Sequence, residues 1–200
     1  MDEPALIQQA QSGDVTAFNG LVMHYQSLAY NVAYRIMGEP QAAEDMTQEA
    51  FISAYKALNR FRGGSFKAWL MRIVTNSCYD ELRRHKRQPQ SSLDELTEEN
   101  ESFTFLRSKA EGPEEHQQQM ELVQAIENCL QGLPDEQRVT AVLCDVEGYD
   151  YNEIADIVGV SLGTVKSRIS RARSKLRECL QGARELLPSN YRLETDGIEK

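Results

Sequence analysis

The amino-acid sequence predicts an all-α protein of two small helical domains joined by a flexible acidic linker. Apolar residues recur at helical spacing in both halves of the chain, and no stretch alternates with a period of two long enough to indicate a sheet. A segment between the halves contains Pro, Gly and many acids but little apolar periodicity. We therefore expect domains at 1–87 and 120–185, a linker at 88–119 and a tail at 186–200.

Charge is distributed unevenly along the 200 residues, whose formal net charge is −9. Residues 59–87 carry eight bases and two acids, and residues 161–185 carry seven bases and two acids. Residues 88–121, between these two basic islands, carry nine acids and two bases. Basic islands in an acidic chain indicate surfaces for an anionic partner such as nucleic acid.

Two features favour a cytoplasmic protein. No apolar run approaches the ~18 residues that a membrane helix needs. The start of the chain, MDEPALIQQAQSGD, is acidic and polar and does not resemble a signal peptide.

The four cysteines fit neither a metal site nor a disulfide framework. None of Cys78, Cys129, Cys144 and Cys179 lies in a CxxC or CxxxC pair, and no histidine stands at zinc-ligand spacing from them. We expect buried thiols in a reducing compartment, and neither a metal nor another cofactor.

Four helices are expected in the N-terminal domain. Pro4 suits the first turn of a helix that Gly13 ends. Asp14 can cap a second helix, which Gly38 and Pro40 terminate. The third helix is expected to carry on one side Ala43, Met46, Ala50, Ala54 and Leu58. The fourth, from about Ser65, is expected to turn inward Phe66, Trp69, Leu70, Ile73 and Ser77.

The outer side of this fourth helix is basic. It shows Arg72, Asn76, Asp80 and Arg83 at helical spacing, and Asp80 is placed to pair with Arg84. A glycine-bearing loop with flanking aromatic residues precedes the helix. Rings for stacking beside cations for the backbone are typical of single-stranded DNA binding. Phe66 and Trp69, taken singly, are more simply explained as core residues.

The acidity of the linker allows two interpretations. The charges solvate a flexible segment, or they repel or mimic nucleic acid and so keep the two basic islands from binding random DNA.

The segment Gly148–Leu176 predicts a helix-turn-helix. Asp150 and Glu153 form a capping box for a short helix. Gly159 ends that helix in a tight turn, and Ser161 caps the second helix. The apolar stripe of the second helix consists of Val165, Ile169, Ala172, Leu176 and Leu180. A preceding helix is expected to pack behind the motif with Val139, Val142, Leu143 and Val146.

The second helix of such a motif places side chains against base edges in the major groove. Small residues at its start, Gly163 and Thr164, allow close approach, and Lys166, Ser167, Ser170 and Arg171 project away from the apolar stripe. Arg168, Arg173, Lys175 and Arg177 remain for phosphate contacts or for pairs with acids of the domain. This pattern indicates DNA binding without saying whether the protein is a repressor, an activator or an initiation factor.

Three segments in order resemble a known family. AAEDMTQEAFISAYKAL, FRGGSFKAWLMRIVTNSCYDELRR and LPDEQRVTAVLCDVEGYDYNEIADIVGVSLGTVKSRISRARSKLRECL are similar to alternative sigma factors of the extracytoplasmic-function group (group 4) of the sigma-70 family. The resemblance covers nearly the whole chain except the linker and about the last fifteen residues. It implies a region 2 domain, a variable linker and a region 4 domain.

The resemblance also implies partners and residue roles. The partners would be core RNA polymerase, through the β′ clamp helices and also the β flap, promoter DNA, and an anti-sigma factor. Polymerase would be bound by Asp45, Gln48, Glu49 and Ile52. The −10 element would be read and melted by Phe61, Arg62, Ser65, Phe66, Arg72, Asn76, Arg83 and Arg84. The −35 element would be read by Thr164, Lys166, Ser167, Arg168, Ser170, Arg171 and Arg173.

The leading hypothesis is thus a promoter-specificity subunit that responds to stress or to the envelope. The alternative is a helix-turn-helix regulator that acts without docking into polymerase. An enzyme is not expected, because the sequence shows no paired catalytic carboxylates in a suitable frame, no phosphate-binding glycine loop and no metal cluster.

Overall fold

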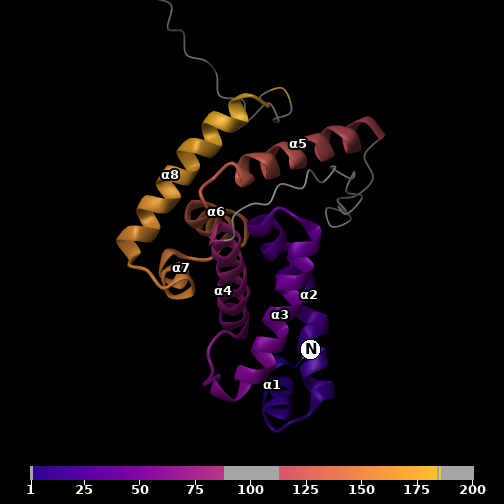
Figure 1. The fold of residues 1–200 in the computed structure, drawn as a ribbon. Coiled ribbons are helices and arrows are strands. Elements are labelled where there is room, and N and C mark those ends of the chain that lie inside the picture. Colours follow the sequence, from indigo (N-terminus) through magenta and orange to yellow (C-terminus); the bar gives the residue numbers. More distant parts are fainter. Residues whose placement is uncertain (1, 88–112, 184, 186–200) are drawn as a thin grey trace, which may run out of the picture.

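The computed structural model describes residues 2–87, 113–183 and 185. Within these residues all regular secondary structure is helical, so the all-α prediction is confirmed there (Figure 1). The helices are α1 Glu3–Gln11, α2 Val15–Met37, α3 Pro40–Ala57, α4 Phe66–Arg87, α5 Pro113–Gln131, α6 Asp135–Ala141, α7 Tyr151–Val158 and α8 Leu162–Gln181, with a 3₁₀ turn η1 Leu58–Arg60 and a π-helical turn η2 Val142–Val146. Because α5 begins at Pro113, the last residues of the predicted linker belong to a helix. The remainder of that linker and the tail lie outside the described residues.

The helix boundaries of the N-terminal domain follow the local signals. Asp14 caps α2 by accepting hydrogen bonds from the backbone N–H groups of Thr16 and Ala17, at 2.8 and 3.2 Å. Gly38 ends α2 in the left-handed conformation, at φ 81°. A β-carbon at position 38 would stand 2.5 Å from the side chain of Gln131. The glycine therefore also leaves room for this side chain of α5 to pack against the end of α2.

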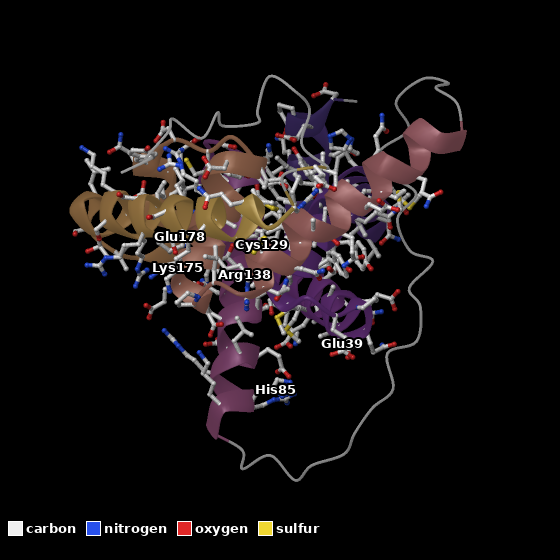
Figure 2. All side chains as sticks on the ribbon, turned by 90° about the horizontal axis from the view of Figure 1, so that it is seen from above. Glu39, His85, Cys129, Arg138, Lys175 and Glu178 are labelled. Carbon is white, nitrogen blue, oxygen red and sulfur yellow. A yellow bond between two sulfur atoms is a disulfide. The ribbon has the colours of Figure 1, made fainter. Side chains whose placement is uncertain are left out.

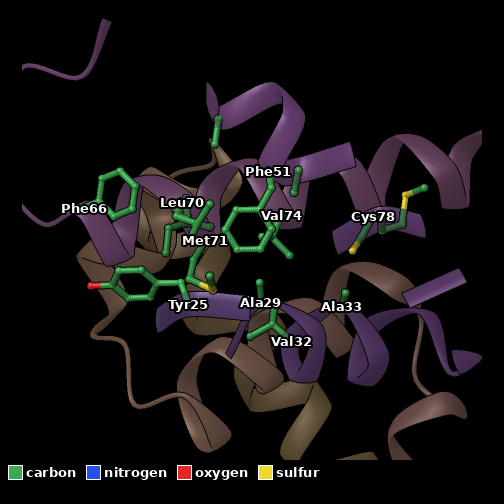
Figure 3. Packing of buried hydrophobic residues seen from close by; sticks show 14 of the residues in the cluster. Tyr25, Ala29, Val32, Ala33, Phe51, Phe66, Leu70, Met71, Val74 and Cys78 are labelled. Atoms are coloured by element: carbon green, nitrogen blue, oxygen red, sulfur yellow. The ribbon is translucent and has the colours of Figure 1, made fainter. Parts of the chain in front are cut away.

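α2, α3 and α4 pack around one hydrophobic core (Figure 3). Ala29, Val32 and Ala33 of α2 are fully buried, and their small side chains allow close approach of α4. Phe66 and Leu70 of α4 are buried as expected. Helix burial lowers the free energy of the fold by about 25 cal/mol for each Å² of apolar surface removed from water.

The buried face of α4 differs from the predicted one. Met71, Val74 and Cys78 are fully buried, whereas Trp69 and Ile73 are half-buried. The reason is that α4 has neighbours on two sides, α2 and α3 on one and α7 on the other. A prediction that assumed one packed side of the helix therefore missed three of its fully buried residues.

In the C-terminal domain, Val139, Val142 and Leu143 are buried behind the helix-turn-helix as predicted, but Val146 is 44% exposed. The N–H of Glu147 bonds to the carbonyl oxygen of Val142, five residues earlier, at 3.0 Å. This wider π turn inserts an extra residue per turn and moves Val146 off the buried side.

The two domains pack against each other. One continuous hydrophobic cluster includes buried residues of both, and α4 stands between α2 and α3 on one side and α7 on the other (Figure 1). Arg35 of α2 pairs with Glu147 at 3.5 Å, and Lys86 of α4 pairs with Asp135 at 2.5 Å. The side-chain amide of Gln131 donates to the carbonyl oxygen of Arg35 at 3.1 Å. The described structure is thus a closed arrangement of the two domains.

The prediction of four unpaired cysteines is wrong for two of them. Cys129 near the end of α5 and Cys179 near the end of α8 form a disulfide, where the two helices meet (Figure 2). Their Cα atoms lie 5.7 Å apart although 50 residues separate them in sequence. Short-range spacing cannot show a pair that only the packing of two distant helices brings together.

Candidate nucleic-acid interface

The helix-turn-helix forms as its sequence signals predict. The carboxylate of Asp150 accepts from the N–H of Glu153 at 2.9 Å, and the carboxylate of Glu153 accepts from the N–H of Asp150 at 2.9 Å, which completes the capping box. Gly159 ends α7 at φ 67°, and the hydroxyl of Ser161 caps α8 by accepting from the N–H of Thr164 at 3.2 Å. These local bonds fix the angle at which α8 leaves the turn.

α8 separates a buried stripe from a basic face. Val165, Ile169 and Ala172 are buried. Lys166, Ser167, Ser170 and Arg171 are all exposed, on the side that the stripe leaves free. Thr164 at the helix start is half-buried. Four of the predicted base-reading side chains are therefore free to meet a groove of DNA.

Two other arginines of α8 are paired with acids of the same domain. Arg173 donates to Asp145 from Nε at 3.2 Å and from Nη2 at 2.5 Å. These bonds raise the pKa of Arg173 above its usual value, so the guanidinium stays charged. Arg168 pairs with Glu136 at 3.6 Å and is mostly covered, with 19% of its side chain exposed. Of the two roles left open for these arginines, the described structure shows the acid pairs.

A concave surface of about 380 Å³ lies along the same side of α8. Lys166, Ser170, Arg173 and Arg177 line it, together with Tyr151 at the start of α7. Tyr151 was not among the predicted site residues. The sequence indicates it only by its position directly after the Asp150 cap, which makes it the first residue of α7.

The second basic island is the outer face of α4 and the loop before it. Arg62, Ser65, Arg72, Asn76, Arg83 and Arg84 are all exposed. Gly63 and Gly64 adopt φ of 100° and 91°, a conformation that residues with a β-carbon rarely reach, and Ser65 caps α4 by accepting from Ala68 at 3.1 Å. This turn presents Arg62 beside the helix start.

Phe61 and Phe66 are not available for stacking on a base. They are 8% and 1% exposed, and their ring centroids lie 5.6 Å apart and each 5.4 Å from that of Trp69. The core needs these rings because α1, α2 and α4 converge there. Their role as direct contacts of the −10 element stays a prediction; in this conformation both rings are enclosed and support the loop from behind.

The ion pairs on α4 differ from the predicted one. Asp80 pairs with Arg83 at 3.8 Å, not with Arg84, which pairs with Glu81 at 2.6 Å. Both pairs span three residues, a spacing that a helix accommodates as well as four. Arg83 and Arg84 keep about two thirds of their side chains exposed. Because exposed ion pairs contribute little free energy, a phosphate can replace the carboxylate partner of either arginine with little loss.

The two basic islands meet at one cavity of about 660 Å³ between the domains. Asn76, Arg83 and Lys86 of α4 line one side, and Glu136 and Arg168 line the other. Near the start of α4, the ammonium of Lys67 lies 5.1 Å from the ring centre of Tyr149 in the C-terminal domain. The closed arrangement therefore places part of each predicted DNA-binding face opposite the other.

A third surface is the outer side of α3. Asp45, Gln48, Glu49 and Ile52 are all exposed at spacings of three, one and three, which place them on one face of the helix. Tyr55, 43% exposed, continues the face three residues after Ile52 and was missed in the prediction. Ile52 and Tyr55 are thus the apolar members of an exposed face that also carries Asp45 and Glu49.

Within the described residues, no group of three or more His, Cys, Asp or Glu side chains is placed to hold a metal ion, and no helix is both long and apolar enough to cross a bilayer.

Two family descriptions match the chain. Sigma-70 region 2 matches residues 21–88, and Sigma-70, region 4 matches residues 123–176.

Curated relatives match most of the chain. It is 37% identical over 172 residues to the ECF RNA polymerase sigma factor SigE of Mycolicibacterium smegmatis, covering 84% of this chain and 65% of that one. It is 37% identical over 179 residues to the RNA polymerase sigma-H factor of Pseudomonas aeruginosa, covering 88% and 92%. It is 35% identical over 183 residues to the ECF RNA polymerase sigma-E factor of Escherichia coli, covering 90% and 95%.

Two solved structures are similar in fold. CnrH in complex with the cytosolic domain of CnrY has a TM-score of 0.64 and 27% identity, with 91% of this chain and 99% of that chain covered. The sigma factor RpoE of Bartonella quintana, in complex with the anti-sigma factor NepR, has a TM-score of 0.65 and 26% identity, with 84% and 98% covered.

Proposed function

The chain belongs to the sigma-70 family of RNA polymerase sigma factors and directs transcription initiation, and we propose how its residues divide that work. Within the family we assign it to the extracytoplasmic-function group (group 4), acting in the cytoplasm and responding to stress or to the envelope. Two of the relatives described above carry the name ECF, which supports this finer assignment. It acts as a specificity subunit, and the polymerase supplies the chemistry.

The exposed face of α8 reads the −35 element. Lys166, Ser167, Ser170 and Arg171 contact base edges, and each good paired contact from Arg or Lys to guanine is worth about 1–3 kcal/mol of discrimination. Arg168 and Arg173 hold phosphates once DNA competes with Glu136 and Asp145. The observation that carries this proposal is the sorting of α8 into a buried apolar stripe and a basic face free of it.

The exposed face of α4 and its preceding loop read and melt the −10 element. The contacts are made by Arg62, Ser65, Arg72, Asn76, Arg83 and Arg84. Extruding a base costs a few kcal/mol of unstacking, which hydrogen bonds and cations at this face must offset. Phe61 and Phe66 belong to the same proposed site, and because both rings are buried in the closed arrangement, they contact a base only after the loop has moved.

The acidic side of α3 docks on core RNA polymerase. Asp45, Gln48, Glu49 and Ile52 contact the β′ clamp helices, and the C-terminal domain contacts the β flap. Charged residues around an exposed apolar one can steer encounter and then bury surface.

Promoter binding requires the domains to separate. The −35 and −10 elements lie roughly two helical turns apart, ~70 Å. In the closed arrangement, however, Arg168 lines the same cavity as Asn76 and Arg83. At ~3.3–3.6 Å per residue, a fully extended chain of the length of residues 88–112 exceeds this distance. We propose that polymerase binds the open form and that an anti-sigma factor holds the closed form.

The test is transcription reconstituted from purified chain, core polymerase and bound genomic fragments. We expect start-site-specific transcripts that require the chain. Asp45→Lys with Glu49→Lys should abolish capture of core polymerase, whereas Glu121→Lys, an exposed acid on α5, should not. A chain that binds DNA but neither captures polymerase nor yields specific transcripts would instead be a helix-turn-helix regulator.

A further inference from the structure

We infer that Cys129 and Cys179 form a reversible dithiol–disulfide site that sets the stability of the C-terminal domain according to the oxidants and thiols around it. This inference goes beyond the proposed function. It rests on the position of the two cysteines, their exposure and the small core that surrounds them.

The bond joins two helix ends that little else holds together. Cys129 lies three residues before Gly132, at the end of α5, and Cys179 lies in the last turn of α8. The local cluster of buried residues that packs these ends consists of Leu130, Leu133, Ala141, Val142 and Ala172. A crosslink stabilises a fold chiefly by constraining the unfolded chain, more so for a long loop, and this bond joins residues 50 positions apart.

The half of α8 that carries Lys166 to Arg171 is held by buried apolar residues of its own. Val165, Ile169 and Ala172 are 0–2% exposed, but beyond them Leu176 is only half-buried, and Arg177 and Glu178 are exposed. The end of α8 therefore depends on the disulfide, while the half that carries Lys166 to Arg171 does not. The site should alter the stability of the domain more than its choice of bases.

The two sulfurs differ in access. Cys129 is 5% exposed, whereas Cys179 is exposed. Small oxidants and thiols can therefore reach Cys179, and Cys129 completes the bond from inside. The Cα separation of 5.7 Å lies within the range that a disulfide bridges, so the bond can open and close without displacing the helices.

The other two cysteines suit this chemistry less well. Cys78 is fully buried in the N-terminal core, and burial raises the pKa of its thiol to about 12, which keeps it protonated and inert. Cys144 is half-buried, and burial together with the charge of Asp145 raises the pKa of its thiol, so less of it is thiolate.

Hydrogen peroxide can supply the oxidation. The Cys179 thiolate attacks one peroxide oxygen, an S–O bond forms, the O–O bond breaks and hydroxide leaves. The Cys129 thiol then loses its proton and attacks the Cys179 sulfur, so that the S–S bond forms and water leaves. The two sulfurs lose two electrons and the peroxide gains two. Thiol–disulfide exchange with a dithiol returns both electrons.

The experiment uses the full chain, reduced with dithiothreitol and then treated with hydrogen peroxide. Maleimide labelling in denaturant should count four thiols after reduction and two after oxidation, and peptide mapping should find Cys129 joined to Cys179. Oxidation should raise the melting temperature by roughly 5–15 °C, reversibly on adding dithiothreitol. Cys179→Ser should remove both effects, and the control Cys144→Ser should keep them.

Binding to a DNA fragment that the chain selects should differ less than about threefold between the two redox states, at a temperature where both are folded. Three results would overturn the inference: a bond formed to Cys78 or Cys144 instead, an unchanged melting temperature, or a bond that dithiothreitol opens only in the unfolded chain. Thiol counts and melting do not depend on transcription, so failure of the proposed function would be seen separately.

Discussion

Arg173 in α8 is held by the carboxylate of Asp145, 28 residues earlier, through two hydrogen bonds of 3.2 and 2.5 Å. The bonds engage a guanidinium on the side of α8 that we propose to face DNA. Asp145 therefore competes with a phosphate for Arg173.

Asp145→Asn should release Arg173 for DNA. We expect affinity for duplex DNA at low salt to rise a few-fold, and the slope of log affinity against log salt to steepen by up to about one ion. Fluorescence anisotropy across a salt series measures both. Asp156→Asn, an exposed acid on α7, is the matched control. An Asp145→Asn slope equal to that of the control would show that Arg173 does not reach a phosphate.

Arg171 and Arg177 should separate base reading from phosphate binding. Arg171→Ala should cost about 1–3 kcal/mol on the selected −35 sequence and relax the preference at one position, because a base contact is lost. Arg177→Ala should weaken binding evenly across sequences and reduce the salt slope. Competition binding with single-base variants of the site distinguishes them, and equal loss of specificity in both variants would mean that the base-reading face was assigned wrongly.

Arg35 should hold the closed arrangement. It pairs with Glu147 at 3.5 Å, and its charge partly offsets the burial that raises the pKa of Glu127, so two acids of the C-terminal domain depend on one cation. Arg35→Ala should destabilise the closed form by about 1–3 kcal/mol.

Small-angle scattering would report this as a larger radius of gyration than in the wild type. Arg60→Ala, an exposed arginine in η1, is the control and should leave the radius unchanged. A compact Arg35→Ala chain would show that apolar contact between α4 and α7 holds the domains without this cation.

Glu127 should make stability depend on pH. Burial raises its pKa to about 7, against an opposing effect of Arg35, and among the described residues its Oε2 meets no hydrogen-bond donor. The folded chain therefore binds a proton that the unfolded chain, with a Glu pKa near 4.3, has lost. The stabilisation from this site is complete below about pH 4.5 and is lost as the pH rises towards 7.

Glu127→Gln should remove that loss. Relative to the wild type, its free energy of unfolding should increase between pH 5 and pH 8 by on the order of 2 kcal/mol. Urea titrations at several pH values measure the difference. Glu121→Gln, which changes an exposed acid on the same helix, should show no such trend, and a parallel pH profile for Glu127→Gln and wild type would contradict the assignment.

Features that depend on neighbours a few residues away were predictable. The capping box of Asp150 and Glu153, the left-handed Gly159 and the Ser161 cap each satisfy backbone groups within one helical turn, so the residues that make them stand together in the sequence. The apolar stripe of α8 was predictable for the same reason, since its period is local.

Features that depend on distant neighbours were not. Met71 and Val74 are more buried than Trp69 because α4 is packed from two sides, and Phe61 and Phe66 are enclosed where three helices converge. The π turn that exposes Val146 breaks the period on which its burial was predicted.

The sequence by itself determined that the chain is helical and where most of its helices begin and end. It also determined that the C-terminal domain exposes a basic helix face, because caps, turns and apolar periods are set within a few residues. The tertiary structure alone decided that Cys129 meets Cys179 and that the two basic islands share one cavity. It also decided that the guanidinium of Arg35 interacts with Glu147 and Glu127 of the other domain. Those relations join residues 50 to more than 100 positions apart, and they exist only once packing has chosen which surfaces face each other.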